Sequence, residues 1–517
     1  MPVGTPAPCG LARVRFDVSA CLRLGWGATA RVESTSLEGC GLNPEFLSRL
    51  QFGLTASFHF IFPPISMGLG IMMVWMAWKH VRTGDPVWRQ ASFFWVKVYG
   101  LVFAMGIATG LVQEFAFGMN WSQYSRFVGN VFGSLLAAEG VFAFFLEGGF
   151  LGLMLFGGDR LGPRMWLLAT FLVVFGAHFS ALWILMANSW MQTPQGFEQH
   201  ASQWGQIAFL TNFGAVVNTP SFLPRLFHTW VASWMIGSAL VLSVSAWYLL
   251  KNRHREFARR NFSAAVKVFT VLAILQVFIF GAQMAISVTK NQEPKLAAME
   301  GNWKTQTCAP LYIVGWVDES AEKTYAIGVP CLLSFLSYGS FDAAVPGLEK
   351  FPEKNWAPVN LAFQAYHAMI DLGFLFPLIG VVAWFVWRRR KGERMPRWLL
   401  WVCISTVFLA EVATIAGWWT AEVGRQPWVV WNILRTDNAV SPTLTTGQVL
   451  LSLVTFALLY ALLLVLFLFL LDRKIKHGPE APEEGHLADL PNTFREVFRQ
   501  RAQARASGEL ELEDVSG

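Results

Sequence analysis

Charged residues are scarce in this sequence. Asp, Glu, Lys and Arg make up only 14% of its 517 residues, whereas 54% of the residues are hydrophobic and the mean hydropathy is +0.42. Soluble domains carry roughly 25% charged residues, so a composition this poor in charge excludes an ordinary soluble protein. The sequence therefore predicts an integral membrane protein.

Cysteine is also rare, and its spacing excludes several kinds of site. The sequence contains no CxxC pair, so neither a structural zinc site nor a disulfide framework is predicted. It also lacks a CxxCH motif, so any haem would be held without a covalent bond to the chain. No histidine cluster of the kind that binds copper and no internal repeat is present. The cysteines are Cys9, Cys21, Cys40, Cys308, Cys331 and Cys403.

Long apolar segments dominate what remains. About nine of them reach the ~20 residues that a helix needs to cross a bilayer. The fold class predicted is an all-α integral membrane protein with about nine transmembrane helices. The segments lie at 52–78, 93–118, 130–156, 165–188, 222–250, 266–289, 359–387, 398–421 and 446–471.

Lys and Arg mark every second connection between these segments. Basic clusters follow the first, third, fifth, seventh and ninth segments, while residues 189–221 contain neither Lys nor Arg. The positive-inside rule places the basic loops in the cytoplasm, so the N-terminus is expected outside and the C-terminus inside. This pattern is typical of membrane topology and not of a basic face that binds nucleic acid, so no nucleic-acid partner is predicted.

The rest of the chain divides around the apolar segments. Residues 1–42 lack the apolar core of a signal peptide and are interpreted as an unstructured extension or as the result of a start codon assigned too early. The connection 290–358 is polar, and a loop of this length is either functional or simply solvated. The predicted units are 1–42 (extension), 43–289 (transmembrane helices 1–6), 290–358 (outer connection), 359–471 (transmembrane helices 7–9) and 472–517 (mobile cytoplasmic tail).

Four residues with metal-binding side chains fall at one depth. His59, His228, Met369 and Glu422 come from the first, fifth, seventh and eighth segments, and each is expected near the outer face. Imidazole, thioether and carboxylate groups can each serve as an axial ligand of haem iron. A single histidine in an apolar helix is more often a packing residue, but four such side chains at one depth favour haem binding.

Several motifs occur together in a fixed order. Over residues 43–475 the chain resembles subunit I of the cytochrome bd-type quinol oxidases. The connection 290–358 lacks a long insertion, which resembles the short quinol-loop branch that includes cyanide-insensitive oxidases. The motifs are Ser48-Arg49-Leu50-Gln51-Phe52 before His59, Ala108-Thr109-Gly110-Leu111, Asn120-Trp121-Ser122, Glu139-Gly140 with Phe144-Phe145-Leu146-Glu147, Ser180-Ala181-Leu182-Trp183-Ile184, Lys295-Leu296-Ala297-Ala298-Met299-Glu300 and Gly424-Arg425-Gln426-Pro427-Trp428.

The resemblance implies a set of haem ligands. His228 and Met369 match the axial ligands of a low-spin b-type haem. His59 and Glu422 match the ligands of a high-spin b-type haem and a d-type haem, and which residue binds which haem stays open, as does replacement of the d-type haem by a b-type haem. His367 lies two positions before Met369 on a nearly opposite helix face, so the two residues cannot bind the same iron.

The resemblance also implies substrates and partners. Lys295 and Glu300 match residues that take part in quinol oxidation, which makes 290–358 an extracytoplasmic quinol-binding loop. The implied partners are quinol, O2 and a second membrane subunit, subunit II, with a small single-helix subunit as a further candidate. The implied location is the cytoplasmic (inner) membrane of a bacterium, in which the chain is multi-pass.

Oxygen reduction near the outer face needs protons from the cytoplasm. Glu139 and Glu147 lie eight residues apart in one segment, about 12 Å along a helix axis, and are predicted to carry these protons. Lys97, Glu114 and Ser180 are further candidates, and the alternative for each carboxylate is a structural ion pair. Because quinol releases protons outside, a redox loop accounts for a proton gradient without a pump.

The run after residue 416 combines indoles, a carboxylate and a guanidinium. Trp418 and Glu422 are four residues apart and share a helix face, so Trp418 is predicted to lie between the haems. Arg425 is predicted to pair with a haem propionate or with Glu422. His178, Asp371 and Glu411 are also intramembrane, and no role is assigned to them.

The leading hypothesis is a haem-bearing subunit of a terminal oxidase that oxidises ubiquinol or menaquinol at the outer face and reduces O2 to water. One alternative is a b-type membrane cytochrome that relays electrons from quinol without reducing O2. Another is a transporter whose buried carboxylates move ions, for which an internal repeat would be expected.

Overall fold

The computed structural model describes residues 43–157, 160–203, 205–390, 392 and 395–480. The predicted extension 1–42 and residues 481–517 of the predicted tail lie outside the described residues. The last helix continues to His477, beyond the predicted end at 471, because Asp472 and Lys476 form an ion pair four residues apart on one face, 2.8 Å between charged atoms.

Nine helical spans among the described residues are long and apolar enough to cross a membrane, which confirms the predicted number. Each predicted apolar segment falls within one of them. They are α3 (Pro44–His59) with α4 (Phe62–Thr83); α5 (Pro86–Met119); α6 (Ser122–Ala138) with η1 (Glu139–Phe144) and α7 (Phe145–Phe156); α8 (Pro163–Gln192); α10 (Phe222–Leu250); α11 (Arg255–Leu275) with η2 (Gln276–Gly281) and α12 (Ala282–Asn291); α15 (Val359–Arg389); α16 (Arg397–Val423); and α17 (Thr446–His477).

Local sequence signals define several helix ends. Asn43 caps α3 by accepting a hydrogen bond from the Phe46 amide at 2.7 Å, and Pro44 occupies the first helical turn. Thr445 and Gln448 form a capping box at the start of α17. Gly84 ends α4 with φ of 68°, a left-handed conformation that glycine adopts without strain.

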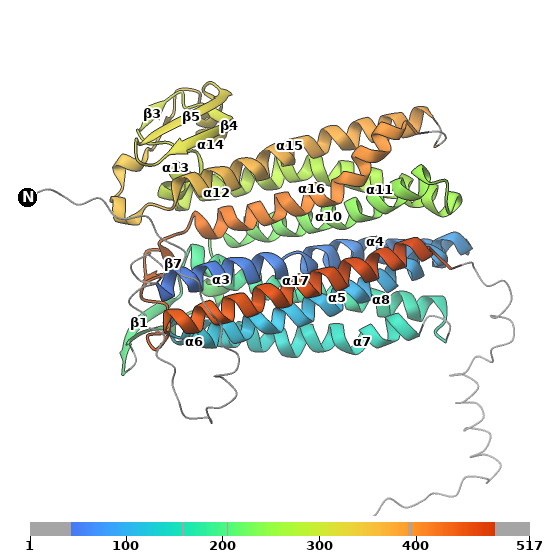
Figure 1. Cartoon of the computed structure of the whole chain (residues 1–517), viewed down its shortest axis with the longest axis horizontal. Coiled ribbons are helices and arrows are strands. Elements are labelled where there is room, and N and C mark those ends of the chain that lie inside the picture. The colour runs from blue at the N-terminus through green and yellow to red at the C-terminus, as the bar shows by residue number, and fades with distance from the viewer. Residues whose placement is uncertain (1–42, 158–159, 204, 391, 393–394, 481–517) are drawn as a thin grey trace, which may run out of the picture.

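The helices form two packed groups (Figure 1). In one group, α10 packs against α11 and α16, and α15 packs against the same two helices. The other group contains α3, α4, α5, α7, α8 and α17. The groups meet where α4 crosses α10, and there the backbones touch at Gly68 and Gly237, because a Cβ atom on either residue would overlap the other helix.

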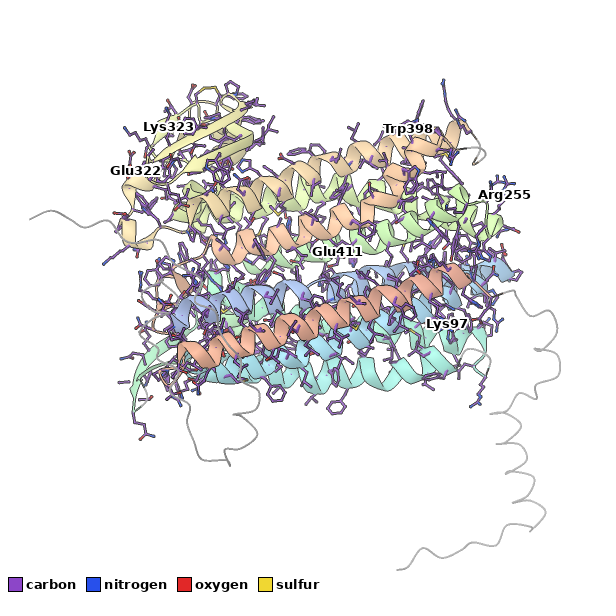
Figure 2. All side chains as sticks on the ribbon, in the orientation of Figure 1. Lys97, Arg255, Glu322, Lys323, Trp398 and Glu411 are labelled. Carbon is purple, nitrogen blue, oxygen red and sulfur yellow. A yellow bond between two sulfur atoms is a disulfide. The ribbon has the colours of Figure 1, made fainter. Side chains whose placement is uncertain are left out.

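The strands gather at one end of the helices, which we call the sheet end (Figure 1). β1 (Phe197–Ser202) and β2 (Gly205–Leu210) form an antiparallel hairpin, followed by the short helix α9 (Phe213–Val217). β7 (Trp428–Val430) pairs with β8 (Leu434–Arg435). We call the opposite end, where α11 and α16 begin, the basic end; Figure 2 shows Arg255 and Trp398 there, and Glu322 and Lys323 at the sheet end.

The connection between α12 and α15 is a packed unit and not an extended loop. Its clusters of buried residues include Trp303 and Leu348 and continue onto Phe363 of α15. A disulfide joins Cys308 and Cys331, so the prediction of no disulfide is wrong for this pair. Spacing in the sequence did not reveal it, because the two cysteines are 23 residues apart and meet only through the folding of the connection. The elements are α13 (Glu293–Met299), β3 (Gln306–Thr307) with β6 (Ala344–Val345), β4 (Leu311–Asp318) with β5 (Lys323–Val329), α14 (Leu332–Tyr338), η3 (Leu348–Lys350) and η4 (Glu353–Asn355).

Candidate functional site

Cross-helix contacts connect the segments that carry the four predicted ligands. The Trp419 indole of α16 donates a hydrogen bond to the Ser57 hydroxyl, 2.7 Å away and two residues before His59. The Met369 sulfur lies against Gly417, where a Cβ atom would be 2.8 Å from it. Hydrogen bonds connect Arg225, near the start of α10, through Asn188 to Glu422, near the end of α16. The contacts therefore bring parts of α3, α10, α15 and α16 to a common level toward the sheet end.

Glu422 is held by a buried polar network. Its Oε1 accepts a hydrogen bond from Asn188 Nδ2 at 2.9 Å, and its Oε2 forms an ion pair with Arg425. Asn188 in turn accepts a hydrogen bond from Arg225 of α10 at 3.0 Å. The ion pair with Glu422 is one of the two partnerships predicted for Arg425.

Two guanidinium groups of this network have hydrogen-bond donors without a partner among the described residues. Arg225 and Arg425 are only 6% and 4% exposed, and each has two buried nitrogens without a hydrogen-bond partner among the described residues. Buried donors in proteins are nearly always paired. Guanidinium groups bind carboxylates with matched geometry, so these donors fit the propionate groups of a haem.

Arg225 and Asn188 are residues that the sequence analysis missed. Arg225 carries a usable signal, because a charged residue in the first turn of an apolar helix is a functional candidate by default. Asn188 carries no such signal, since an uncharged polar residue near the end of an apolar segment is common. Their connection to Glu422 depends on the packing of α8, α10 and α16.

His59 lies at the end of α3, where the first span is interrupted before α4. The Thr109 hydroxyl lies 2.9 Å from Nδ1 of His59 and within donating distance of the Met105 carbonyl at 2.8 Å. When the hydroxyl donates to that carbonyl, it can accept from Nδ1 of His59, which then carries the ring proton. This tautomer leaves the lone pair of Nε2 available to iron. A Cβ atom on Gly110 would lie 3.1 Å from the His59 ring, so glycine gives the imidazole its space.

His228 and Met369 belong to the same four-helix group. Gln276 lies at the start of the π-helical segment η2. Its side-chain nitrogen Nε2 is 3.2 Å from His228 Nδ1 and 3.4 Å from His228 Nε2. Met369 lies against α16, as described above. His367 is directed elsewhere: its ring stacks on Phe363 at 3.9 Å and its Nδ1 lies 2.8 Å from the Phe363 carbonyl. Met369 and His367, the two alternatives for the axial ligand opposite His228, therefore lie in different surroundings.

Trp418 extends from α16 toward α3. Its ring centre is 6.1 Å from that of Phe52, which is in turn 6.2 Å from the ring of Trp121. An aromatic contact thus joins the helix that carries Glu422 to the helix that carries His59.

Lys295 and Glu300 of the folded connection are both buried, with exposures of 1% and 0%. Lys295 donates hydrogen bonds to the Ala421 carbonyl at 2.7 Å and to Gln192 Oε1 at 3.2 Å. Burial holds the pKa of Lys295 well below its usual range, and the nearby Arg225 lowers it further. Burial raises the pKa of Glu300 to about 8.

The two intramembrane carboxylates predicted to carry protons have neutral partners. Glu139 Oε1 accepts a hydrogen bond from Ser180 of α8 at 2.7 Å, and Glu147 Oε1 accepts one from Tyr99 of α5 at 3.1 Å. Neither forms an ion pair with a described Lys or Arg, so the alternative of a structural ion pair is not supported in the described part of the chain. Lys97, in contrast, pairs with Glu480.

Two of the intramembrane residues without an assigned role differ in their surroundings. His178 has both ring nitrogens engaged, Nδ1 with the Val174 carbonyl at 2.7 Å and Nε2 with the Trp234 indole at 2.8 Å, which identifies it as a packing residue. Glu411 lies in the middle of α16 (Figure 2), and both of its carboxylate oxygens are buried without a hydrogen-bond partner among the residues that the structure describes. It is eleven residues, or about 16 Å, before Glu422 on the same helix face.

The chain is similar to proteins of one known family. The pattern of the family described as cytochrome bd terminal oxidase subunit I matches residues 47–479. The chain is 36% identical to the cytochrome bd-II ubiquinol oxidase subunit 1 of Escherichia coli (strain K12), over 84% of this chain and 97% of that protein. It is 35% identical to the cytochrome bd ubiquinol oxidase subunit 1 of Bacillus subtilis (strain 168), over 84% and 94%. The solved structure of bd oxidase from Geobacillus thermodenitrificans superimposes with a TM-score of 0.78 at 27% identity, covering 85% of this chain and all of that one.

Proposed function

Because this chain belongs to the cytochrome bd terminal oxidase subunit I family, we propose that it is the haem-bearing subunit that oxidises quinol at the sheet end and reduces O2 to water with protons from the basic end. The chain is an integral membrane protein and part of a quinol oxidase. The observation that carries the proposal in detail is the Glu422 network, in which two buried arginines have nitrogens without a hydrogen-bond partner among the described residues.

The residues fit three haems. His228 and Met369 would hold a low-spin b-type haem, and His59 and Glu422 would hold a high-spin b-type haem and a d-type haem or its b-type replacement. Arg225 and Arg425 would bind propionate groups through their free nitrogens. When bound, the haems carry electrons and bind oxygen. Trp418 fills the space between the helices of His59 and Glu422.

Quinol oxidation is assigned to the folded connection. Two quinols release four electrons and four protons, and one O2 takes up four electrons and four protons to give two waters. Burial raises the pKa of Glu300 to about 8, so its ionised form, which dominates above that pH, can accept a proton from a quinol hydroxyl. Lys295 anchors α13, the short helix that directly precedes Glu300, against Ala421 and so keeps the quinol site next to Glu422.

Proton delivery is assigned to Glu139 and Glu147. Each carboxylate has a hydroxyl partner, Ser180 or Tyr99, that can both donate and accept a hydrogen bond. The basic end faces the cytoplasm by the positive-inside rule. The Cys308–Cys331 disulfide at the opposite end supports this orientation, because disulfides persist in oxidising compartments outside the cytoplasm. Proton uptake from the cytoplasm and proton release on the outer side both contribute to a proton gradient across the membrane.

A second membrane subunit is expected to cover part of the helix surface. Val141, Phe142 and Phe145 are 58%, 61% and 71% exposed beside Glu139. Glu114, also exposed, interacts electrostatically with Glu139. Carboxylates are unfavourable next to lipid, so this surface is better explained by subunit II than by the bilayer alone. A small single-helix subunit is a further candidate partner.

The test is a reduced-minus-oxidised spectrum of the purified complex with and without carbon monoxide, together with quinol-dependent oxygen consumption. A carbon-monoxide-sensitive high-spin signal and oxygen uptake are expected. A spectrum with low-spin haem alone, without oxygen uptake, would support the relay cytochrome instead.

A further inference from the structure

A groove with a volume of about 500 Å³ lies between α11 and α15 toward the basic end. Its lining combines two cations with two indoles and contains no acidic residue. The lining residues are Ser263, Lys267, Trp384, Trp387 and Arg388.

Both cations of the groove are unpaired within the described part of the chain. Lys267 is exposed on α11, twelve residues or about 18 Å from Arg255 at the start of that helix. Neither Lys267 nor Arg388 forms a hydrogen bond or ion pair with a described residue. An ammonium group on the lipid-facing side of a transmembrane helix is unfavourable unless it reaches an anion or water.

The indoles give the groove a fixed wall. Trp387 is only 8% exposed and its ring centre lies 4.6 Å from that of Phe262 on α11. Gly392 packs closely against it, since a Cβ atom on Gly392 would lie 2.8 Å from the Trp387 ring. Trp384 is one turn earlier on the same face and remains partly exposed. Tryptophan at this position is typical of the membrane interface.

The charge around the groove favours an anionic occupant. Arg389 and Arg397 lie at the same end of α15 and α16. The nearest acid on the first turn of α11, Glu256, is already paired with Arg260 at 2.8 Å. The groove therefore offers free positive charge at its polar end and apolar helix surface along its length.

We propose that this groove binds an anionic phospholipid, with its phosphate between Lys267 and Arg388 and its acyl chains along α11 and α15. Basic pockets between transmembrane helices on the cytoplasmic side are a recognised setting for such headgroups. A second groove, between α4 and α8, has a similar volume of about 530 Å³ and a Trp75-Trp78 pair but only one lining cation, Arg164. With one cation in its lining, this second groove cannot hold a phosphate between two positive charges.

The test uses the purified complex in nanodiscs of phosphatidylcholine with increasing phosphatidylglycerol. Phosphatidylglycerol should raise the thermal unfolding midpoint, and native mass spectrometry should show it retained in preference to phosphatidylcholine. The double variant Lys267→Gln, Arg388→Gln should weaken phosphatidylglycerol binding about tenfold or more. The matched control Arg255→Gln, which removes a charge from the same helix outside the groove, should bind like the parent.

Several outcomes would overturn the proposal. These are equal retention of both lipids, unchanged binding in the double variant, or a midpoint shift produced by inorganic phosphate alone. A photo-reactive residue at position 267 that crosslinks to another subunit, and not to lipid, would do the same. If the double variant does not assemble, lipid retention by the parent and crosslinking at position 267 still decide between these outcomes.

Discussion

Lys295 donates a hydrogen bond from its ammonium group to the main-chain carbonyl of Ala421, 2.7 Å away. The contact joins the folded connection to the residue that directly precedes Glu422. Gln192 strengthens it, because its side chain accepts from Lys295 and donates to the same carbonyl at 3.2 Å. The proposed quinol site and the proposed Glu422 haem site therefore share one buried network.

Replacing Lys295 with Met should uncouple the two sites. Loss of a buried charged donor leaves the Ala421 carbonyl and Gln192 with fewer partners, which typically corresponds to about 1.5–3 kcal/mol, or roughly a 10- to 100-fold change. We expect quinol kcat/KM to fall by that order while the haem spectrum is preserved. Lys290→Met, an exposed lysine on α12, is the control and should change little.

Glu300→Gln should remove a pH dependence. The carboxyl with a pKa of about 8 is protonated below that pH and ionised above it, so a base role predicts that quinol kcat/KM rises from pH 7 to pH 9. In the variant this rise should be lost; an unchanged profile would show that another group accepts the proton. The same pKa shift affects stability. Because the native state holds this proton more tightly than the unfolded chain does, the contribution of Glu300 to the free energy of unfolding falls as the pH rises from 4.5 to about 8.

Arg225→Gln should lower the haem content of the purified complex. The variant loses both the bond to Asn188 and the free nitrogens proposed to bind propionate groups. Haem-to-protein ratio and the high-spin signal are the measurements. Arg435→Gln, which removes a partly exposed arginine that contacts Asn355 at the sheet end, is the control. Full haem content in Arg225→Gln would mean that propionates are held elsewhere.

Met369→Leu should abolish the low-spin haem signal, whereas His367→Ala should retain it. The expectation follows from the position of Met369 against α16 and of His367 against Phe363. Absorbance in the reduced state distinguishes the two, and the reverse result would assign the ligand to His367.

Glu411→Met should leave thermal stability unchanged or higher. The substitution removes a carboxyl group whose buried oxygens have no hydrogen-bond partner in the described part of the chain, and it keeps a similar side-chain length. Differential scanning of the purified complex measures the effect. A clear loss of stability would reveal that the bound haems or subunit II supply a partner.

Much of the fold was predictable from local sequence. Hydropathy located all nine spans found in the described part of the chain, because a membrane-crossing helix satisfies its backbone internally and must be apolar over its length. The ends were less predictable: α11 begins at Arg255, before the apolar segment at 266, because its first turns are amphipathic. The pairing of Cys308 with Cys331 was not predictable, since it depends on how β4, β5 and α14 fold.

The sequence by itself determined which segments cross the membrane and predicted that four ligand-type residues lie at one depth, because both follow from counting residues along helices. The tertiary structure decided which side chains meet. It linked Arg225 through Asn188 to Glu422 and joined Lys295 to Ala421. These relationships depend on the rotation and packing of helices far apart in the chain, which no local pattern encodes.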